Sequence, residues 1–385
     1  MGITRLSKAV LYTVIFFLFT SCNWFVKKGG EVNRSLLMYM AVTSNLSTSI
    51  NVNLSDVKNS PFVPEYFDIK KGSGDVLLVM EHREKDIPRL KRFYRNEFGE
   101  VVEEILQEYE GRSSIEPELL HEVLVYANTI FPAKESGILF SSHGTGWIPD
   151  GYYANPSAVK SFGQIDKKEM DVKDMAAAIP DKYSYIIMDA CLMGSVEVAY
   201  EMKDKGEYML LSPTEIMAAG FPYGDVIEQV FYAEGDVQSR LSSIAASYYE
   251  FYADEGSGGG TISLIKSSEL AGLADAVRNI ISADGDKIAT LNMSKLQPYF
   301  RGSIRHWFYD LTDFMENISS DSDRLARYNA AIGKAVVVKY STDKFLSVPI
   351  HTYSGLSTYI PNPTNTYLDA YYRTLAWNGA VQMLK

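Results

Sequence analysis

The sequence predicts an α/β protein in which a mostly parallel β-sheet is flanked by helices, with a mainly helical C-terminal subdomain. Short apolar runs bounded by turn residues recur along the first two thirds of the chain, as in buried strands. Stretches with helical spacing separate several of these runs, and such alternation is typical of parallel sheets. After residue 266 longer helical stretches replace the apolar runs.

Each element is predicted from one of these two patterns. Residues 117–130 show the helical pattern most clearly, with Leu120, Val123 and Leu124 on one stripe and Pro132 after the end. Residues 98–109 fit either a helix or a long edge strand. The predicted strands are 35–42, 74–80, 137–141, 185–189, 208–212 and 261–265, with 347–352 and 355–360 as a last pair that returns to the main sheet. The predicted helices are 45–57, 117–130, 172–179, 196–202, 225–252, 268–283 and, with interruptions, 301–338.

The N-terminus has the pattern of an export signal. Arg5 and Lys8 precede an apolar run at 9–19, which is shorter than the about 20 residues that span a bilayer. The residues that end in Cys22 resemble a bacterial lipobox, which implies cleavage before Cys22 and acylation of that residue. The protein would then be exported and anchored in a membrane, on its periplasmic or cell-surface side. A plain secretory signal cut nearby is the alternative.

The charge balance narrows the class of partners. The net charge is −11, and no long basic stripe or nucleic-acid motif is present. Nucleic acid is therefore not predicted as a partner. An acidic surface is compatible with basic peptides as substrates.

Two strand ends carry residues capable of nucleophilic chemistry. His143 follows the apolar run at 137–141, and Cys191 follows the run at 185–189. The carboxyl ends of parallel strands form ligand-binding crevices, so this placement can bring a nucleophile and its base together. If Cys22 is acylated, Cys191 has no disulfide partner within the chain. Cys191 could instead be a small buried hydrophobic residue.

The surrounding residues favour chemistry at this position. An imidazole can activate a thiol and later protonate the leaving group. Gly144 allows the backbone to approach a substrate carbonyl, and a helix that begins after Cys191 would direct its positive end at the thiolate. The order, His143 before Cys191, is not that of papain.

Four segments together resemble the clostripain family of bacterial cysteine peptidases. They read SHGTGW, DACLMGSVEVAYEM, LSPTEIMAAGFPY and SGLSTYIP, and they occur in the family order. The pairs His143-Gly144 and Ala190-Cys191 also resemble those of caspase-like cysteine peptidases. The resemblance extends from about Leu36 to Pro361 and implies a caspase-like fold.

The resemblance implies roles for individual residues. His143 would be the general base and acid, and Cys191 the nucleophile. The backbone N–H groups of Gly144 and Cys191 would form the oxyanion hole. Asp189 would line the S1 pocket and select Arg or Lys, since a desolvated carboxylate pairs strongly with a cation. The alternative for Asp189 is a helix N-terminal cap.

Family members also mature by cutting themselves between the His and Cys segments. Residues 147–166 are rich in Gly, Pro, Ser, Asn and Tyr, which predicts an exposed loop. Lys160 is the only basic residue in this stretch, and we predict autocatalytic cleavage after it. The protein would be made as a zymogen and be a monomer after processing.

Metal chemistry has little support in the sequence. No zinc-ligand or EF-hand spacing occurs, and His82 lies among charged residues where a solvated turn is predicted. No cofactor is predicted, although the family resemblance leaves calcium open.

These observations define five segments and a leading function. The segments are 1–21 as a lipoprotein signal peptide, 22–34 as a tether, 35–266 as a caspase-like catalytic core, 267–346 as a mainly helical region, and 347–385 as returning strands with a C-terminal helix. The predicted function is a cysteine endopeptidase that cleaves protein or peptide substrates after Arg or Lys. A catalytically silent surface lipoprotein that binds partners, and a cysteine acyltransferase, are the alternatives.

Overall fold

The structure is a computed structural model, and most of the chain is described in it. The described residues are 28–42, 46–83, 85–149, 152, 162–165, 168–254, 256–300, 307–362 and 364–385. Within these ranges, no helix is both long and apolar enough to cross a membrane.

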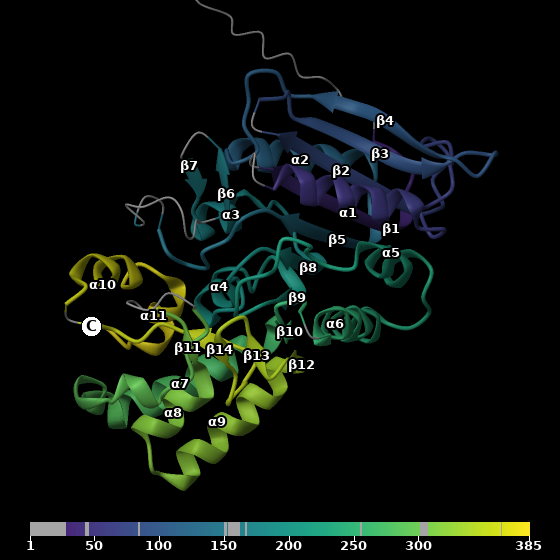
Figure 1. The fold of residues 1–385 in the computed structure, drawn as a ribbon. Helices are drawn as coiled ribbons and strands as arrows, with labels where there is room; N and C mark the ends of the chain where they lie inside the picture. Colours follow the sequence, from purple (N-terminus) through teal and green to yellow (C-terminus); the bar gives the residue numbers. More distant parts are fainter. Residues whose placement is uncertain are drawn as a thin grey trace, which may run out of the picture.

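A nine-stranded sheet forms the centre of the molecule, in the order β12-β10-β9-β8-β5-β1-β2-β3-β4 (Figure 1). The strands β9, β8, β5, β1 and β2 run parallel, and antiparallel strands extend the sheet at both edges. The predicted mostly parallel sheet is thereby confirmed. The strands of this sheet are β1 (Val32–Val42), β2 (Val76–Arg83), β3 (Arg89–Arg95), β4 (Val101–Glu108), β5 (Ala133–Ser141), β8 (Tyr183–Asp189), β9 (Gly206–Leu211), β10 (Thr261–Lys266) and β12 (Val336–Ser341).

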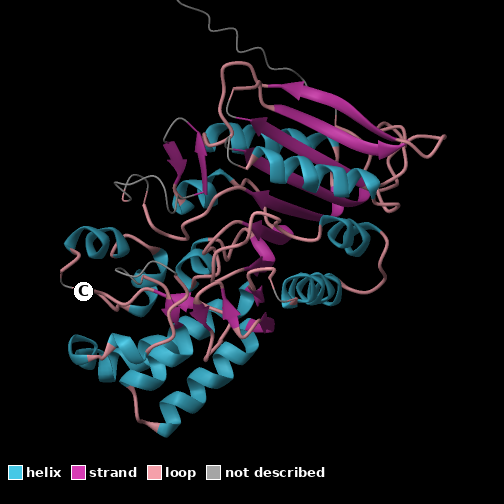
Figure 2. Ribbon diagram, in the orientation of Figure 1, coloured by secondary structure: helices cyan, strands magenta, loops and turns pink. Residues whose placement is uncertain are grey.

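Helices cover both faces of the sheet, which explains why the central strands are apolar almost throughout. In β1, Leu36 and Met38 point into one core, while Leu37 and Tyr39 point into the other. The first core is closed by α1 (Ser47–Asn59), α5 (Tyr223–Phe231) and α6 (Val237–Ala253). The second is closed by α2 (Pro117–Ile130), α3 (Val172–Ala178), α4 (Val196–Glu201) and α7 (Leu270–Asp284). Figure 2 shows these helical layers on either side of the strands.

The C-terminal part is mainly helical, but its strands differ from the prediction. Helices α8 (Leu311–Ile318) and α9 (Ser322–Ala335) pack beside α7, and β12 is the strand that joins the main sheet. The segments 347–352 and 355–360 do not return to it. They contribute β14 (Val348–Pro349) and β15 (Ser357–Thr358) to two small sheets, with β13 (Lys344–Phe345) and β11 (Tyr309–Asp310). The remaining elements are β6 (Phe162–Ile165), β7 (Lys168–Met170), α10 (Thr366–Tyr372), α11 (Ala376–Val381) and the 3₁₀ turns Ser267–Glu269, Gly285–Thr290 and Met293–Lys295.

Two further differences lie at the edge formed by β3 and β4. The ambiguous segment at 98–109 is a strand, and β3 was not predicted because charged residues alternate along it. The solvated turn predicted at His82 is wrong, because this residue lies in β2. His82 is 3% exposed, and its Nδ1 lies 2.9 Å from the Ser114 hydroxyl.

Candidate active site

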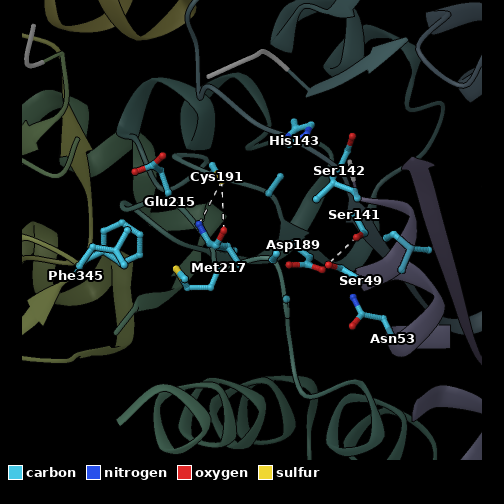
Figure 3. Close-up of a pocket in the computed structure, with 17 residues that line it drawn as sticks. Ser49, Asn53, Ser141, Ser142, His143, Asp189, Cys191, Glu215, Met217 and Phe345 are labelled. Carbon is cyan, nitrogen blue, oxygen red and sulfur yellow. Dashed lines mark hydrogen bonds between the residues drawn. The ribbon is translucent and has the colours of Figure 1, made fainter. Parts of the chain in front are cut away.

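The ends of β5 and β8 bring the two sequence-predicted reactive residues together. These strands are parallel neighbours, and their last register pair is Ser141 with Asp189. His143 and Cys191 each follow two residues later, and both line one cavity of ≈ 360 Å³. Figure 3 shows them above Asp189 in this cavity. The prediction that two strand ends bring these residues to one crevice is confirmed.

The backbone directly after Cys191 is held in an uncommon conformation. Leu192 has φ 62°, a region that residues other than glycine seldom adopt. Its N–H donates to the Thr214 carbonyl at 2.9 Å, and the Gly194 N–H donates to the Ser212 carbonyl at 2.8 Å. Strain of this kind persists only where surrounding contacts impose it. Cys191 therefore stands on a turn fixed by the segment that follows β9.

The predicted helix after Cys191 is confirmed and begins at the predicted residue. Helix α4 starts at Val196 and has six residues, and the Ser195 side chain caps it by accepting the Val198 N–H. A helix dipole acts mainly within the first turn, and the first residue of α4 follows Cys191 by five positions.

Gly144 is required by the close approach of the two strand ends. A Cβ atom on Gly144 would lie 2.5 Å from the Cys191 carbonyl oxygen and 3.0 Å from the Cys191 nitrogen. No side chain larger than hydrogen fits there without movement. The backbone after His143 therefore lies directly against the backbone of Cys191.

The thiol itself contacts the segment that follows β9. Cys191 Sγ accepts the Ile216 N–H at 3.3 Å and donates toward the Ile216 carbonyl at 3.6 Å. Glu215, which is 6% exposed, also lines the cavity. The Cys191 thiol forms no disulfide with any described residue.

Asp189 lies at the cavity floor with its carboxylate held by two hydroxyl groups. The Tyr223 hydroxyl donates to Oδ2 at 2.5 Å, and the Ser141 hydroxyl donates to the same oxygen at 3.1 Å. Asp189 is 6% exposed, and burial raises its pKa to about 6 although both hydrogen bonds lower it. Since Ser195 caps α4, the alternative role of Asp189 as that helix's N-cap is wrong.

A glycine leaves space above this carboxylate. Gly220 has φ 70°, and a Cβ atom there would lie 2.6 Å from Asp189 Oδ2. The Tyr252 hydroxyl donates to the Gly220 carbonyl at 2.7 Å and fixes the loop. Ser49 and Asn53 of α1 close the same end of the cavity (Figure 3). The cavity thus gives access to the buried Asp189 carboxylate, and no described residue forms an ion pair with it.

A second buried carboxylate, that of Glu197, holds the segment that contacts the turn after Cys191. Glu197 Oε1 accepts the Thr358 hydroxyl at 2.8 Å and the Tyr359 N–H at 2.9 Å. Burial raises the pKa of Glu197 to about 7. These bonds tie the segment SGLSTYIP to α4, and the Ser357 N–H also donates to the Gly194 carbonyl at 3.0 Å.

The structure adds cavity residues that the sequence reasoning missed. Ser141 lines the cavity and directly precedes the segment SHGTGW, and Tyr223, which holds Asp189, ends the segment LSPTEIMAAGFPY, so a signal existed near both. Phe345 and Leu346 line the cavity from a hairpin far along the chain, where no sequence signal pointed to it. Among the described residues, no group of three or more His, Cys, Asp and Glu side chains is placed to hold a metal ion.

Two predicted site residues lie outside the described part of the chain, and the predicted loop at 147–166 needs correction. Cys22 and Lys160 lie outside the described residues. The loop predicted at 147–166 is not exposed throughout, because Trp147 is 0% exposed and packs against Tyr359 and Tyr372. Strand β6 also lies within that range.

A family profile and several solved structures are similar to this chain. The profile of the clostripain family matches residues 38–383. An inactive zymogen C11 protease from Parabacteroides distasonis is 27% identical, with a TM-score of 0.78 over 90% of this chain and 97% of its own. A secreted C11 cysteine protease from Bacteroides thetaiotaomicron, in complex with an irreversible peptide inhibitor, is 29% identical, with a TM-score of 0.77 over 91% and 98%.

A third solved structure covers less of the chain. A clostripain from Bacteroides thetaiotaomicron, in complex with the peptide inhibitor BTN-VLTK-AOMK, is 29% identical, with a TM-score of 0.50 over 57% of this chain and 97% of its own. No curated protein matches the sequence. Since the family profile covers most of the sequence and the fold agrees, the chain belongs to the clostripain family of cysteine peptidases.

Proposed function

We propose that this protein is a cysteine endopeptidase that cleaves after Arg or Lys, with Cys191 as nucleophile and His143 as general base and acid. The observation that carries the proposal is the buried Asp189 carboxylate in the same cavity as both residues. No cation of the described residues pairs with Asp189, and a buried carboxylate in that situation favours a positively charged ligand.

The proposed reaction uses these groups in two stages. His143 takes the thiol proton as Cys191 Sγ attacks the scissile carbonyl and forms the S–C bond. The N–H groups of Gly144 and Cys191 donate to the resulting oxyanion. His143 then gives its proton to the leaving amine as the C–N bond breaks. Water hydrolyses the thioester with His143 as base, and the thiol is restored.

Asp189 sets the specificity of this reaction in our proposal. Tyr223 and Ser141 orient the carboxylate, and Gly220 leaves room above it. An Arg or Lys side chain that enters the cavity supplies the missing positive charge. The inhibitor in the Bacteroides thetaiotaomicron clostripain complex contains the peptide VLTK, which is compatible with a basic residue at this position.

Maturation and location complete the proposal. The zymogen and the secreted protease among the similar structures favour a precursor that is exported. We infer self-cleavage after Lys160, acylation of Cys22 with anchoring in a membrane, and a monomer after processing.

The test is the intact mass of the chain from Asn23 onward after incubation, beside Cys191→Ala. We expect two wild-type fragments that meet at Lys160 and an uncut variant. Peptide reporters with Arg, Lys or norleucine before the cleaved bond then measure specificity. Whole wild-type protein would remove self-cleavage from the proposal. Failure to cut any Arg or Lys reporter would refute the peptidase and favour a silent binding lipoprotein.

A further inference from the structure

We propose that the cavity contains a second, apolar subsite, formed by Met217, Phe345 and Leu346, which binds the substrate side chain immediately before the basic residue. This inference rests on the proposed function and specifies its substrate class. The preferred peptides carry an aliphatic side chain, such as Leu or Met, followed by Arg or Lys.

The two ends of the cavity differ in chemistry. In Figure 3, Asp189, Ser49 and Asn53 lie at one end, whereas Met217 and Phe345 lie toward the other. Leu346 also lines the cavity and lies beside Met217, since both side chains approach Gly258. In Figure 3, Cys191 lies above and between the Asp189 end and the Phe345 end. Phe345 is 1% exposed, so its ring belongs to the fixed wall of the cavity. A peptide whose scissile bond lies at Cys191 would meet both ends at once.

The apolar wall is held rigidly by the hairpin of β13 and β14. Leu346 occupies its turn with φ 49°, a backbone conformation that costs free energy for leucine. The Leu346 N–H donates to the Gly258 carbonyl at 2.7 Å. A Cβ atom on Gly258 would lie 3.0 Å from Met217 Sδ and 3.2 Å from Leu346 Cδ2. Met217 and Leu346 therefore both pack on this glycine, and the wall is preformed.

The position of His143 determines which substrate residue meets the wall. His143 must protonate the leaving amine, so the chain after the cleaved bond departs on the His143 side. In Figure 3, Phe345 lies on the opposite side of Cys191 from His143. The wall therefore faces the residues before the cleaved bond. Since Asp189 takes the basic residue, the wall takes its predecessor.

The charge of Glu215 further limits which side chains can precede the basic residue. The lining at this end is a thioether, an aromatic ring and an aliphatic chain, and Glu215 is the charged residue that lines the cavity beside them. A buried aliphatic side chain gains transfer free energy against such a surface. An acidic side chain would meet Glu215 and lose its hydration. We therefore expect discrimination in the order Leu or Met, then Gly, then Asp.

The test uses peptide reporters that end in Lys or Arg and differ only in the preceding residue. Incubated wild-type protein should cleave the Leu peptide with a kcat/KM about tenfold or more above that of the Gly peptide. Met217→Glu should cleave peptides with a preceding Lys better than peptides with a preceding Leu. Loss of folding cannot produce such a gain of activity. Leu346→Gly should reduce the Leu preference while relieving the left-handed backbone.

The control for the charge change is Phe98→Glu. Phe98 is 78% exposed in the turn between β3 and β4, at the sheet edge away from the cavity, and its substitution should leave all ratios unchanged. Equal cleavage of the Leu, Gly and Asp peptides would overturn the subsite while leaving basic specificity intact. Absence of Cys191-dependent cleavage of every peptide would instead refute the proposed function and the subsite with it.

Discussion

Asp189 and Glu197 are two buried carboxylates on either side of the Cys191 turn, and their surroundings differ in one decisive respect. Asp189 opens onto the cavity and is held by two hydroxyl groups. Glu197 is enclosed and accepts the Thr358 hydroxyl of β15 and the backbone N–H of Tyr359, the next residue. Burial raises the pKa of both, so a perturbed pKa alone does not identify a substrate site. What distinguishes Asp189 from Glu197 is its access to the cavity.

The largest expected effect comes from removing the charge that faces the cavity. Asp189→Asn should lower kcat/KM for Arg and Lys reporters by roughly 10²–10³-fold, because the buried substrate cation loses its partner. Stability near neutral pH should be unchanged or higher, since ionisation of a buried carboxylate opposes folding. Steady-state kinetics and thermal unfolding measure the two effects. If Asp189→Asn lost stability but kept its specificity, Asp189 would have the structural role that we assign to Glu197.

Glu197→Ala should show the opposite pattern. The variant leaves the buried Tyr359 N–H without its acceptor and opens a cavity, which should cost about 2–4 kcal/mol of unfolding free energy. The preference for Lys over norleucine should be retained in the protein that remains folded. Urea unfolding measures the loss, and Glu197→Gln, which keeps an acceptor, is the control. Equal unfolding midpoints for wild type and Glu197→Ala would contradict a structural role.

The pH dependence should separate the two carboxylates again. Asp189 must be ionised to bind a cation and has a free-enzyme pKa of about 6. The ratio of kcat/KM for Lys over norleucine peptides should therefore fall as pH decreases through 6, by up to about tenfold per pH unit. Using the ratio removes titration of Cys191 and His143 from the measurement. A ratio that stays constant down to pH 5 would contradict the role of Asp189.

The same raised pKa values predict the sign of the stability change. Each carboxyl group holds its proton more tightly when folded than when unfolded, so stability should fall as pH rises from the unfolded pKa to the folded one. For Asp189 this window runs from 3.8 to about 6, and for Glu197 from 4.5 to about 7. Comparing the pH dependence of unfolding for Asp189→Asn and Glu197→Gln with wild type assigns each window. No change in slope for either variant would contradict the assignment.

The smallest effect should come from the hydroxyl that orients Asp189. The 2.5 Å hydrogen bond from Tyr223 to Oδ2 lowers the pKa of Asp189, and Tyr223→Phe removes this bond. We expect about a tenfold loss in kcat/KM for Lys peptides and an acid limb displaced to higher pH. Ser141→Ala, which removes the longer bond of 3.1 Å, is the graded comparison. An unmoved acid limb would show that Tyr223 acts only by packing.

The sequence was sufficient for the parts of the molecule built from local patterns. The parallel strands were found because both sheet faces are covered, which makes runs such as 185–189 apolar throughout. Their ends then located His143 and Cys191. Strand β3 and the pairing of β12 were missed because strands at or next to a sheet edge mix charged and apolar residues and depend on distant partners.

The rest of the site depends on contacts between distant segments. Tyr223 reaches Asp189 from the first residue of α5, and Leu346 reaches the cavity from a hairpin with a left-handed backbone. Tyr223 ends a segment with the family pattern, but that pattern does not show that its hydroxyl contacts Asp189, and no sequence pattern marks Leu346. The partners of Glu197 likewise lie more than 150 residues away in sequence, as the separation of 161 to Thr358 shows.

The central claim is that Cys191 and Asp189 serve one substrate site for basic residues. Its most direct test is labelling of the incubated protein with two peptide ketone inhibitors that differ only in Lys or norleucine beside the reactive group, followed by intact mass and peptide mapping. We predict one adduct on Cys191 from the Lys compound, much less from the norleucine compound, and loss of this preference in Asp189→Asn. Equal labelling by both compounds, or none at Cys191, would contradict the account.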